Sequence, residues 1–167
     1  MGQADYFNRI VASKDLSPYF LLERGDFAYN KSYSVGYPVG VVRRLDRYDS
    51  GVVSPLYICF RPKADAVDSD FLDQMLRAGR LDDGIAWIAK EGARNHGLLN
   101  VGSADFFSLE LDLPPLGEQR RVAEILDTID ETIQATELII AKLELARLGI
   151  LNELLSPGLS ASPPEGW

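Results

Sequence analysis

Short runs of apolar, β-branched and aromatic residues alternate with polar residues in the first part of the chain. The runs lie at residues 21–30, 39–45 and 52–62. Gly25-Asp26 inside the first run and the polar segment 46–51 between the other two have the composition of turns. This pattern predicts a β-meander of short strands. Pro55 should mark an edge strand or a bulge, because proline donates no ladder hydrogen bond.

Helical spacing replaces the alternation after residue 68. The apolar residues that follow this period are Phe71, Met75, Leu76, Ile85, Ile88 and Ala89. Ser69 or Asp70 can cap the N-terminus of a helix here, and Gly92 can end it. We therefore expect a helical segment between residues 68 and 92.

Strict alternation returns just before two consecutive prolines. Its apolar positions are Phe107, Leu109, Leu111 and Leu113, with serine, glutamate and aspartate between them. A period of two predicts a half-buried strand, which Pro114 and Pro115 should end.

A long helix is predicted from Leu116 to Leu155, a stretch without proline. With Val122 at heptad position a, apolar residues recur at positions a, d and e, which is broader than a strict coiled-coil seam. The residues of this stripe are Val122, Ile125, Leu126, Ile129, Ile133, Ile139, Ile140, Leu143, Ile150 and Leu154. A helix of about 55–60 Å is longer than a small domain is wide. We expect its stripe to be covered by a partner helix in trans.

These elements predict an α+β fold in three parts. Residues 1–115 form a small mixed α/β domain, residues 116–155 form one long coiled-coil α-helix, and residues 156–167, rich in proline, serine and glycine, form a disordered tail. With 167 residues, 46% of them hydrophobic, the chain can bury one core.

Composition bears on where in the cell the protein is expected to function and on what it is expected to bind. No apolar run is long enough to span a membrane, and the first residues do not have the pattern of a signal peptide. The one cysteine, Cys59, lies in an apolar run and is expected to be buried and reduced, in a cytoplasmic protein. The net charge of −8 argues against a protein that binds nucleic acid, but a basic cluster between residues 24 and 47 allows a local basic face.

Catalytic chemistry has little support in the sequence. His96 is the only histidine, and no residues at a recognised spacing complete a triad or a metal site with it. The chain lacks the glycine-rich phosphate loops, GxxxxGK and GxGxxG after a strand. It also lacks the Asn/Asp-Pro-Pro-aromatic tetrapeptide of methyltransferases. We expect no catalytic activity and no metal or cofactor in this chain.

Three groups of residues are candidates for contacts with DNA, each with an ordinary structural alternative. Arg94, Asn95 and His96 can contact base edges, or they can satisfy the carbonyls at the end of a helix. A polar-aromatic loop suited to phosphate and sugar contacts could equally be an exposed loop; it contains Lys31, Ser32, Tyr33, Ser34 and Tyr37. A basic group could contact phosphates or form a solvated turn with Asp46 and Asp49; it contains Arg43, Arg44 and Arg47.

The run LPPLGEQRRVAEIL at residues 113–126 resembles the start of the conserved helical region in specificity subunits of type I restriction–modification systems. The segments GDFAYNKSYSVGYPVGVVRRLD, VSPLYICFRPK and EGARNHGLLNV are similar to one class of DNA target-recognition domain in that family. The resemblance covers about residues 5–155 and corresponds to the later part of one recognition domain with one conserved helix.

The resemblance implies a non-catalytic subunit that recognises double-stranded DNA and directs methyltransferase and endonuclease subunits to a target site. It implies that S-adenosylmethionine, ATP and Mg²⁺ belong to those partners. The long helix would act as a spacer and pair with a second copy or with another specificity subunit. The alternative is a truncated interaction protein that does not recognise DNA and that either dimerises or docks on such subunits through its long helix.

Overall fold

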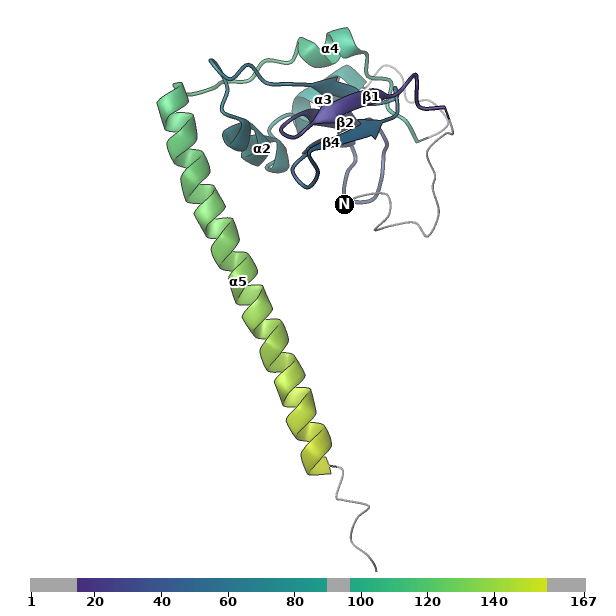
Figure 1. The fold of residues 1–167 in the computed structure, drawn as a ribbon. Helices are drawn as coiled ribbons and strands as arrows, with labels where there is room; N and C mark the ends of the chain where they lie inside the picture. The colour runs from purple at the N-terminus through teal and green to yellow at the C-terminus, as the bar shows by residue number, and fades with distance from the viewer. Residues whose placement is uncertain (1–14, 90–96, 156–167) are drawn as a thin grey trace, which may run out of the picture. The chain divides into compact units, whose positions relative to one another are not determined.

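The computed structural model describes residues 15–89 and 97–155. The chain divides into two compact units, residues 1–123 and residues 124–167 (Figure 1). The predicted α+β class is confirmed, with short antiparallel strands first and one long helix at the C-terminal end.

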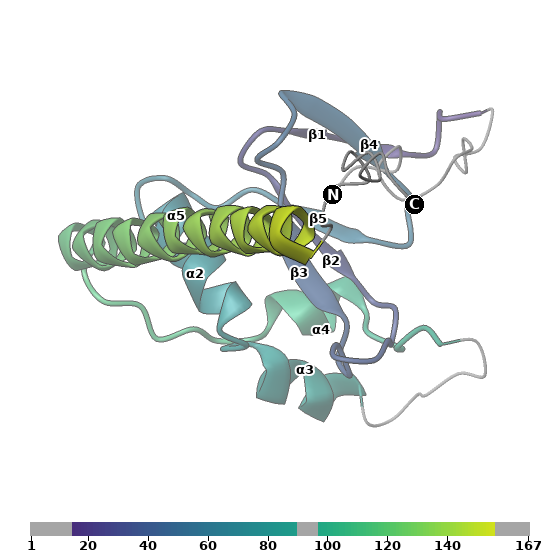
Figure 2. The same ribbon diagram turned by 90° about the horizontal axis from the view of Figure 1, so that it is seen from below.

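Five short strands lie in the described part of the first unit, in two antiparallel sheets. They are β1 (Phe20–Glu23), β2 (Phe27–Asn30), β3 (Val41–Arg44), β4 (Ser50–Val53) and β5 (Ile58–Phe60). One sheet pairs β1 with β4, and the other has the order β3-β2-β5. Figure 2 shows the β1–β4 pair on one side of the three-stranded sheet and the short helices on the other.

The meander prediction is wrong in its connections, because β4 pairs with β1 and not with β3. Residues 20–30 run antiparallel to residues 41–53 as one interrupted ribbon, with Phe27 opposite Arg44 and Glu23 opposite Ser50. The turn predicted at Gly25-Asp26 forms one residue earlier, at Arg24-Gly25, and it interrupts this ribbon instead of closing a hairpin. Gly25 supplies a φ of +92° there, which L side chains rarely adopt.

Two further predictions about the strands need correction. Pro55 lies in neither a strand nor a bulge but in the turn between β4 and β5, where Tyr57 N–H donates to the carbonyl of Ser54 at 3.0 Å. Proline suits the second position of such a turn because its φ is fixed. Cys59 is free but half-buried in β5 rather than fully buried. Burial, followed by the nearby Asp26, raises the pKa of its thiol.

The helical segment after residue 68 consists of two helices, α2 (Ser69–Arg77) and α3 (Asp82–Ala89). The break occurs at Gly79, whose φ is +73° and where a side chain would collide with the carboxylate of Asp82. The N-cap is Asp68, one residue before the predicted candidates, and its carboxylate accepts two backbone N–H groups of the first turn at 3.1 Å each. Gly92 lies outside the described residues.

The strand predicted at residues 107–113 does not form. The short helix α4 (Ser103–Phe107) precedes it, and residues 108–115 contain no strand. The alternation in burial is nonetheless present from Leu109 on, since Leu109, Leu111 and Leu113 are half-buried while the residues between them are exposed. Phe107, the first predicted apolar position, is 57% exposed. The alternation therefore indicates a segment with one face against the core, although no neighbouring strand pairs with it.

The core lies between the three-stranded sheet and helices α2, α3 and α4. Phe27 and Tyr29 of β2 are fully buried, and Ile85 of α3 is 2% exposed. Tyr29 stacks on Phe106 of α4 with ring centres 5.0 Å apart, and Phe27 stacks on Phe60 at 5.3 Å. Aromatic stacking of this kind stabilises a core beyond the area it buries.

The long helix α5 (Leu116–Leu155) has the predicted bounds. Its first turns belong to the first unit, where Gln119 is 1% exposed and Ala123 is 3% exposed. The Gln119 side chain donates to the carbonyls of Pro114 (2.8 Å) and Ala66 (3.1 Å) and accepts the N–H of Asp68 (2.9 Å). Both polar atoms of this buried amide are thus satisfied by backbone.

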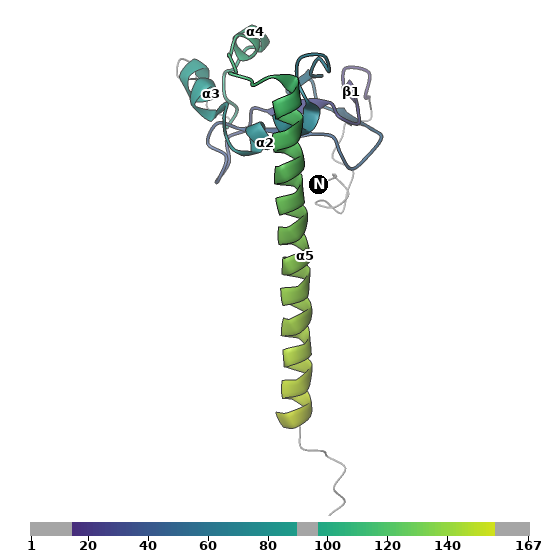
Figure 3. The same ribbon diagram turned by 90° about the vertical axis from the view of Figure 1, so that its left-hand side faces the viewer.

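Beyond Ala123, every residue of α5 except Asp127 and Asp130 is exposed, and Figure 3 shows the helix as uninterrupted. Exposed members of the predicted stripe include Ile125, Ile129, Ile133, Ile139, Ile140, Leu143, Ile150 and Leu154. The threonines at 128, 132 and 136 each donate their hydroxyl to the carbonyl four residues earlier. In the described part of the chain, no helix combines the length and the apolar character needed to cross a membrane.

Replacing Gln119 by alanine should destabilise the first unit by about 1–3 kcal/mol, because three backbone groups lose the partner that the buried amide gives them. Gln134→Ala is the matched control, since Gln134 is exposed on the same helix. Urea denaturation followed by circular dichroism measures both. Equal stability of the two variants would contradict the assigned role of Gln119.

Candidate nucleic-acid interface

The polar-aromatic loop predicted from sequence connects β2 to β3, and a second segment is hydrogen-bonded along it. Tyr33 N–H donates to the carbonyl of Gly97 at 2.7 Å, and Leu99 N–H donates to the carbonyl of Lys31 at 2.9 Å. Ser32 and Leu98 form an antiparallel bridge between these two bonds. The structure therefore brings residues 31–33 against residues 97–99, the segment that directly follows Arg94, Asn95 and His96 in sequence.

The tip of the loop is a two-residue hairpin. Ser34 and Tyr37 exchange two backbone hydrogen bonds, at 2.9 and 3.2 Å. Val35 and Gly36 form the turn, with φ of +85° at Gly36 and a negative φ at Val35, since no described non-glycine residue has a positive φ. These signs fit a type II turn, which requires glycine at its third position.

The base of the loop is held by the core. The Tyr29 hydroxyl donates to the carbonyl of Val39 at 2.7 Å, and burial, followed by Asp82, raises the pKa of Tyr29 to about 12. Tyr29 therefore stays neutral and keeps its donor at any physiological pH. Gly40 lies against Tyr29 and the carbonyl of Asn30, where an added Cβ would collide with both. The loop thus leaves the core at a defined position.

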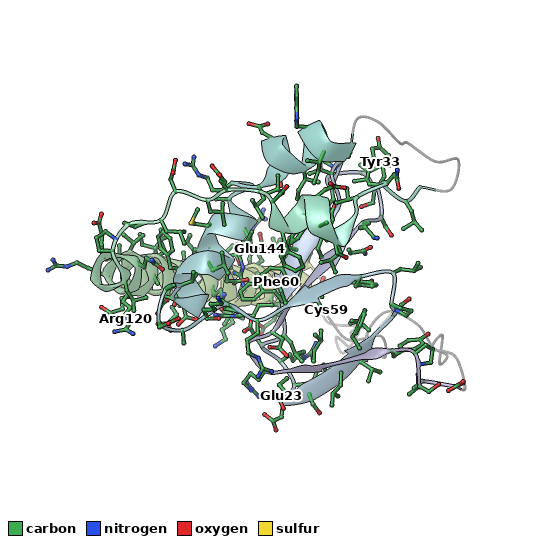
Figure 4. The ribbon with its side chains drawn as sticks, turned by 90° about the horizontal axis from the view of Figure 1, so that it is seen from above. Glu23, Tyr33, Cys59, Phe60, Arg120 and Glu144 are labelled. Carbon is green, nitrogen blue, oxygen red and sulfur yellow. The ribbon has the colours of Figure 1, made fainter. Side chains whose placement is uncertain are left out.

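Cationic and aromatic side chains lie beside the hairpin. The guanidinium of Arg43 lies 5.6 Å from the ring centre of Tyr37 and donates to its hydroxyl at 3.3 Å. Lys31 Nζ is 3.4 Å from the carbonyl of Val101. Tyr33 is 61% exposed, and Figure 4 places it at the edge of the domain away from Arg120. These side chains can present charge and flat aromatic surface to a phosphate-sugar backbone.

Arg44 follows Arg43 in sequence but has a different environment. Its side chain is 15% exposed and forms ion pairs of 2.6 Å with both Asp46 and Asp70. It also donates to the hydroxyl of Ser69 at 3.1 Å. Arg44 therefore connects β3 to the N-terminus of α2, and it has no place in the candidate interface.

Arg47 lies in the connection between β3 and β4, at the end of β3 away from Tyr37. It is exposed, and its guanidinium lies 5.8 Å from the ring centre of Tyr48. The structure thus places Arg47 apart from the group formed by Tyr37 and Arg43. Arg94, Asn95 and His96 lie outside the described residues, and their contacts with DNA stay a prediction.

A second basic surface was not foreseen from the sequence. Three arginines from separate segments line an open depression of about 350 Å³ beside the start of α2: Arg24, Arg61 and Arg120. Each is paired with a carboxylate: Arg24 with Asp49 at 2.9 Å, Arg61 with Asp26 at 2.5 Å and Arg120 with Asp68 at 3.7 Å. Arg61 holds the pKa of Asp26 below its usual value. The carboxylates offset the arginine charge, which makes this surface a poor phosphate site.

The described residues hold no cluster of metal-ligating side chains. Within residues 15–89 and 97–155, no group of three or more histidine, cysteine, aspartate or glutamate side chains could hold a metal ion. The hairpin and the side chains beside it can bind a ligand through exposed aromatic, hydroxyl and cationic groups.

The protein has an α+β domain followed by a long helix, and two solved structures share that arrangement. One is the HsdS subunit from Thermoanaerobacter tengcongensis, with a TM-score of 0.60, 18% identity, and coverage of 88% of this chain and 37% of that one. The other is a chain from a structure of the type I R-M system, with a TM-score of 0.61, 19% identity and coverage of 92% and 39%. These likenesses concern the fold.

Sequence comparison gives the family. Residues 23–145 match the model of the type I restriction modification DNA specificity domain, so the chain belongs to that family. A curated relative, described as a putative type I restriction enzyme MjaX specificity subunit, comes from Methanocaldococcus jannaschii. It is 26% identical over 102 residues, which are 61% of this chain and 23% of the relative. The chain thus spans about a quarter of this relative's length, and the family resemblance inferred from residues 113–126 is confirmed.

Arg44→Ala should lower the free energy of unfolding by about 1–2 kcal/mol, because two carboxylates lose their partner. Arg43→Ala is the matched control and should change stability by less than about 0.5 kcal/mol, since Arg43 is exposed. Thermal and urea denaturation of both variants measure the difference. If Arg43→Ala proves the more destabilising, the two roles have been assigned the wrong way round.

Proposed function

We propose that this chain is a DNA-recognition unit of a type I restriction–modification specificity subunit. The observation that carries the proposal is the family match over residues 23–145. That range includes the hairpin loop with its exposed tyrosines and the adjacent Arg43. The chain would direct methyltransferase and endonuclease subunits to a target site in double-stranded DNA, in the cytoplasm.

In this proposal the chain binds and the partners catalyse. S-adenosylmethionine, ATP and Mg²⁺ would be used by the methyltransferase and endonuclease subunits. The chain alone would neither cleave nor methylate DNA. Its contribution is to hold a loop, fixed to the core through Tyr29 and to residues 97–99 by backbone hydrogen bonds, in the position where base edges and phosphates can contact it.

The charge distribution determines which part of the chain would contact DNA. The net charge is −8, and the residues after Pro115 contribute −5 of it, from four basic and nine acidic side chains. The helix should therefore repel phosphate, and the loop side chains Lys31, Tyr33, Tyr37 and Arg43 should make the contacts. Binding should be weak at physiological salt without partner subunits and should fall steeply as salt rises.

We further propose that α5 pairs with another helix of the same kind, in the first instance a second copy of this chain. Its stripe of apolar side chains is exposed from Ile125 to Leu154. Heptad spacing of this kind is buried by a facing helix with the same period. The paired helices would then serve as a spacer between recognition units.

DNA recognition can be tested by selecting bound duplexes from a randomised library with the full chain, alone and with its methyltransferase subunit. We expect one family of sequences to be enriched. Arg43→Ala should weaken binding to all duplexes about equally and lower the slope of log K against log salt by about 1, as for one lost phosphate contact.

Arg147→Ala is the matched control, since it removes the same charge from the exposed helix and should leave the salt slope unchanged. Failure to enrich any duplex, with or without the methyltransferase subunit, would contradict the proposed function.

Pairing of the helix can be tested by sedimentation equilibrium of the full chain. Replacing Ile129 and Ile140 by aspartate should weaken self-association at least tenfold, because it would bury unpaired charges in the helix interface. The control replaces Gln134 and Ala141, which lie outside the stripe, by aspartate. A strictly monomeric parent protein at tens of micromolar would overturn pairing with a second copy.

A further inference from the structure

Val35 is the most exposed of the described large apolar side chains, at 99%. Scattered exposed apolar residues are common, but this one stands at the tip of a hairpin between two further exposed aromatic residues, Tyr33 and Tyr37. Nothing within the described residues covers it. An apolar side chain held fully in water gains none of the stabilisation that burial would give it, so Val35 would gain this stabilisation from a partner that covers the tip.

The position of Val35 is fixed by the backbone around it. The two hydrogen bonds between Ser34 and Tyr37 close the turn. Gly36 has the positive φ that a type II turn requires at its third position. Below the tip, the bonds to Gly97 and from Leu99 and the Tyr29 hydroxyl hold the loop. The valine is therefore presented by a defined scaffold that needs little ordering on binding.

The surroundings of the tip favour an anionic partner that carries an apolar group. Arg43, stacked on Tyr37, and Lys31 supply positive charge beside the hairpin, and the serine and tyrosine hydroxyls can bond phosphate oxygens. In duplex DNA, the apolar group that base pairs present in the major groove is the C5-methyl of thymine. That groove, about 12 Å wide, admits a two-stranded β-ribbon, whereas the minor groove is about half as wide.

We propose that the hairpin at residues 33–37 enters the major groove and that Val35 at its tip contacts the C5-methyl group of a thymine in the target sequence. This inference rests on the proposed function, and it adds a specificity-determining residue that neither residue type nor spacing indicated in the sequence. Tyr33, Tyr37 and Arg43 would position the hairpin on the backbone, and Val35 would make a base-specific contact.

Thymine and uracil differ only in this methyl group, which gives a direct test. With a duplex selected by the full chain, each thymine is replaced singly by deoxyuridine and binding is measured by fluorescence anisotropy. For the parent protein, one replacement should weaken binding about fourfold, the factor that corresponds to about 0.8 kcal/mol for one buried methyl group. For Val35→Ser, the same replacement should have no effect, because the apolar partner is gone.

Val52→Ser is the matched control, since Val52 is an exposed valine in β4, and it should keep the parent's sensitivity to uracil at that position. The proposal is overturned if no thymine replacement affects the parent, if the selected sequence has no thymine, or if Val35→Ser remains as sensitive as the parent. Each of these results leaves DNA recognition intact. A parent protein that selects no duplex at all contradicts the proposed function itself.

Discussion

The buried amide of Gln119 joins the first turn of α5 to the rest of the first unit. Its oxygen and nitrogen bond three backbone groups, from Ala66, Asp68 and Pro114, that come from the segment before α2 and from the double proline. Because this side chain is 1% exposed, losing one of these bonds would leave a polar group without water. The same contact orders Asp68, which caps α2. One glutamine thus joins the first turn of α5 to the helix that packs on the sheet.

Features that depend on neighbouring residues could be predicted from the sequence. The bounds of α5 follow from its heptad period and the prolines before it, and the turn at Gly25 follows from local composition. The pairing of β4 with β1 could not be predicted, because it depends on contacts between distant segments such as Arg24 N–H to the carbonyl of Asp49 at 2.9 Å. Likewise, the alternation after Phe107 indicated one buried face correctly but could not reveal that no strand lies beside it.

The candidate site likewise has features that could be predicted from the sequence and features that could not. The loop at residues 31–37 could be predicted from its polar and aromatic composition, but Arg43 and Arg44 are equivalent in sequence. Only the fold separates them, because Asp70 comes from α2 to bind Arg44 while Arg43 stacks on Tyr37. Val35 was missed because an isolated valine in a loop carries no sequence signal, and its exposure becomes visible only with the turn in place. The basic depression was missed since its arginines come from three separate segments.

An acidic protein can bind DNA when a few fixed side chains make the contacts and the excess negative charge lies elsewhere. In the proposed function, the loop contacts the duplex and the helix does not. Hydrogen–deuterium exchange of the full chain with and without a selected duplex tests this most directly. We predict slower exchange on DNA binding within residues 31–43 and no change along residues 124–155. Slower exchange confined to the helix, with the loop unaffected, would contradict the claim.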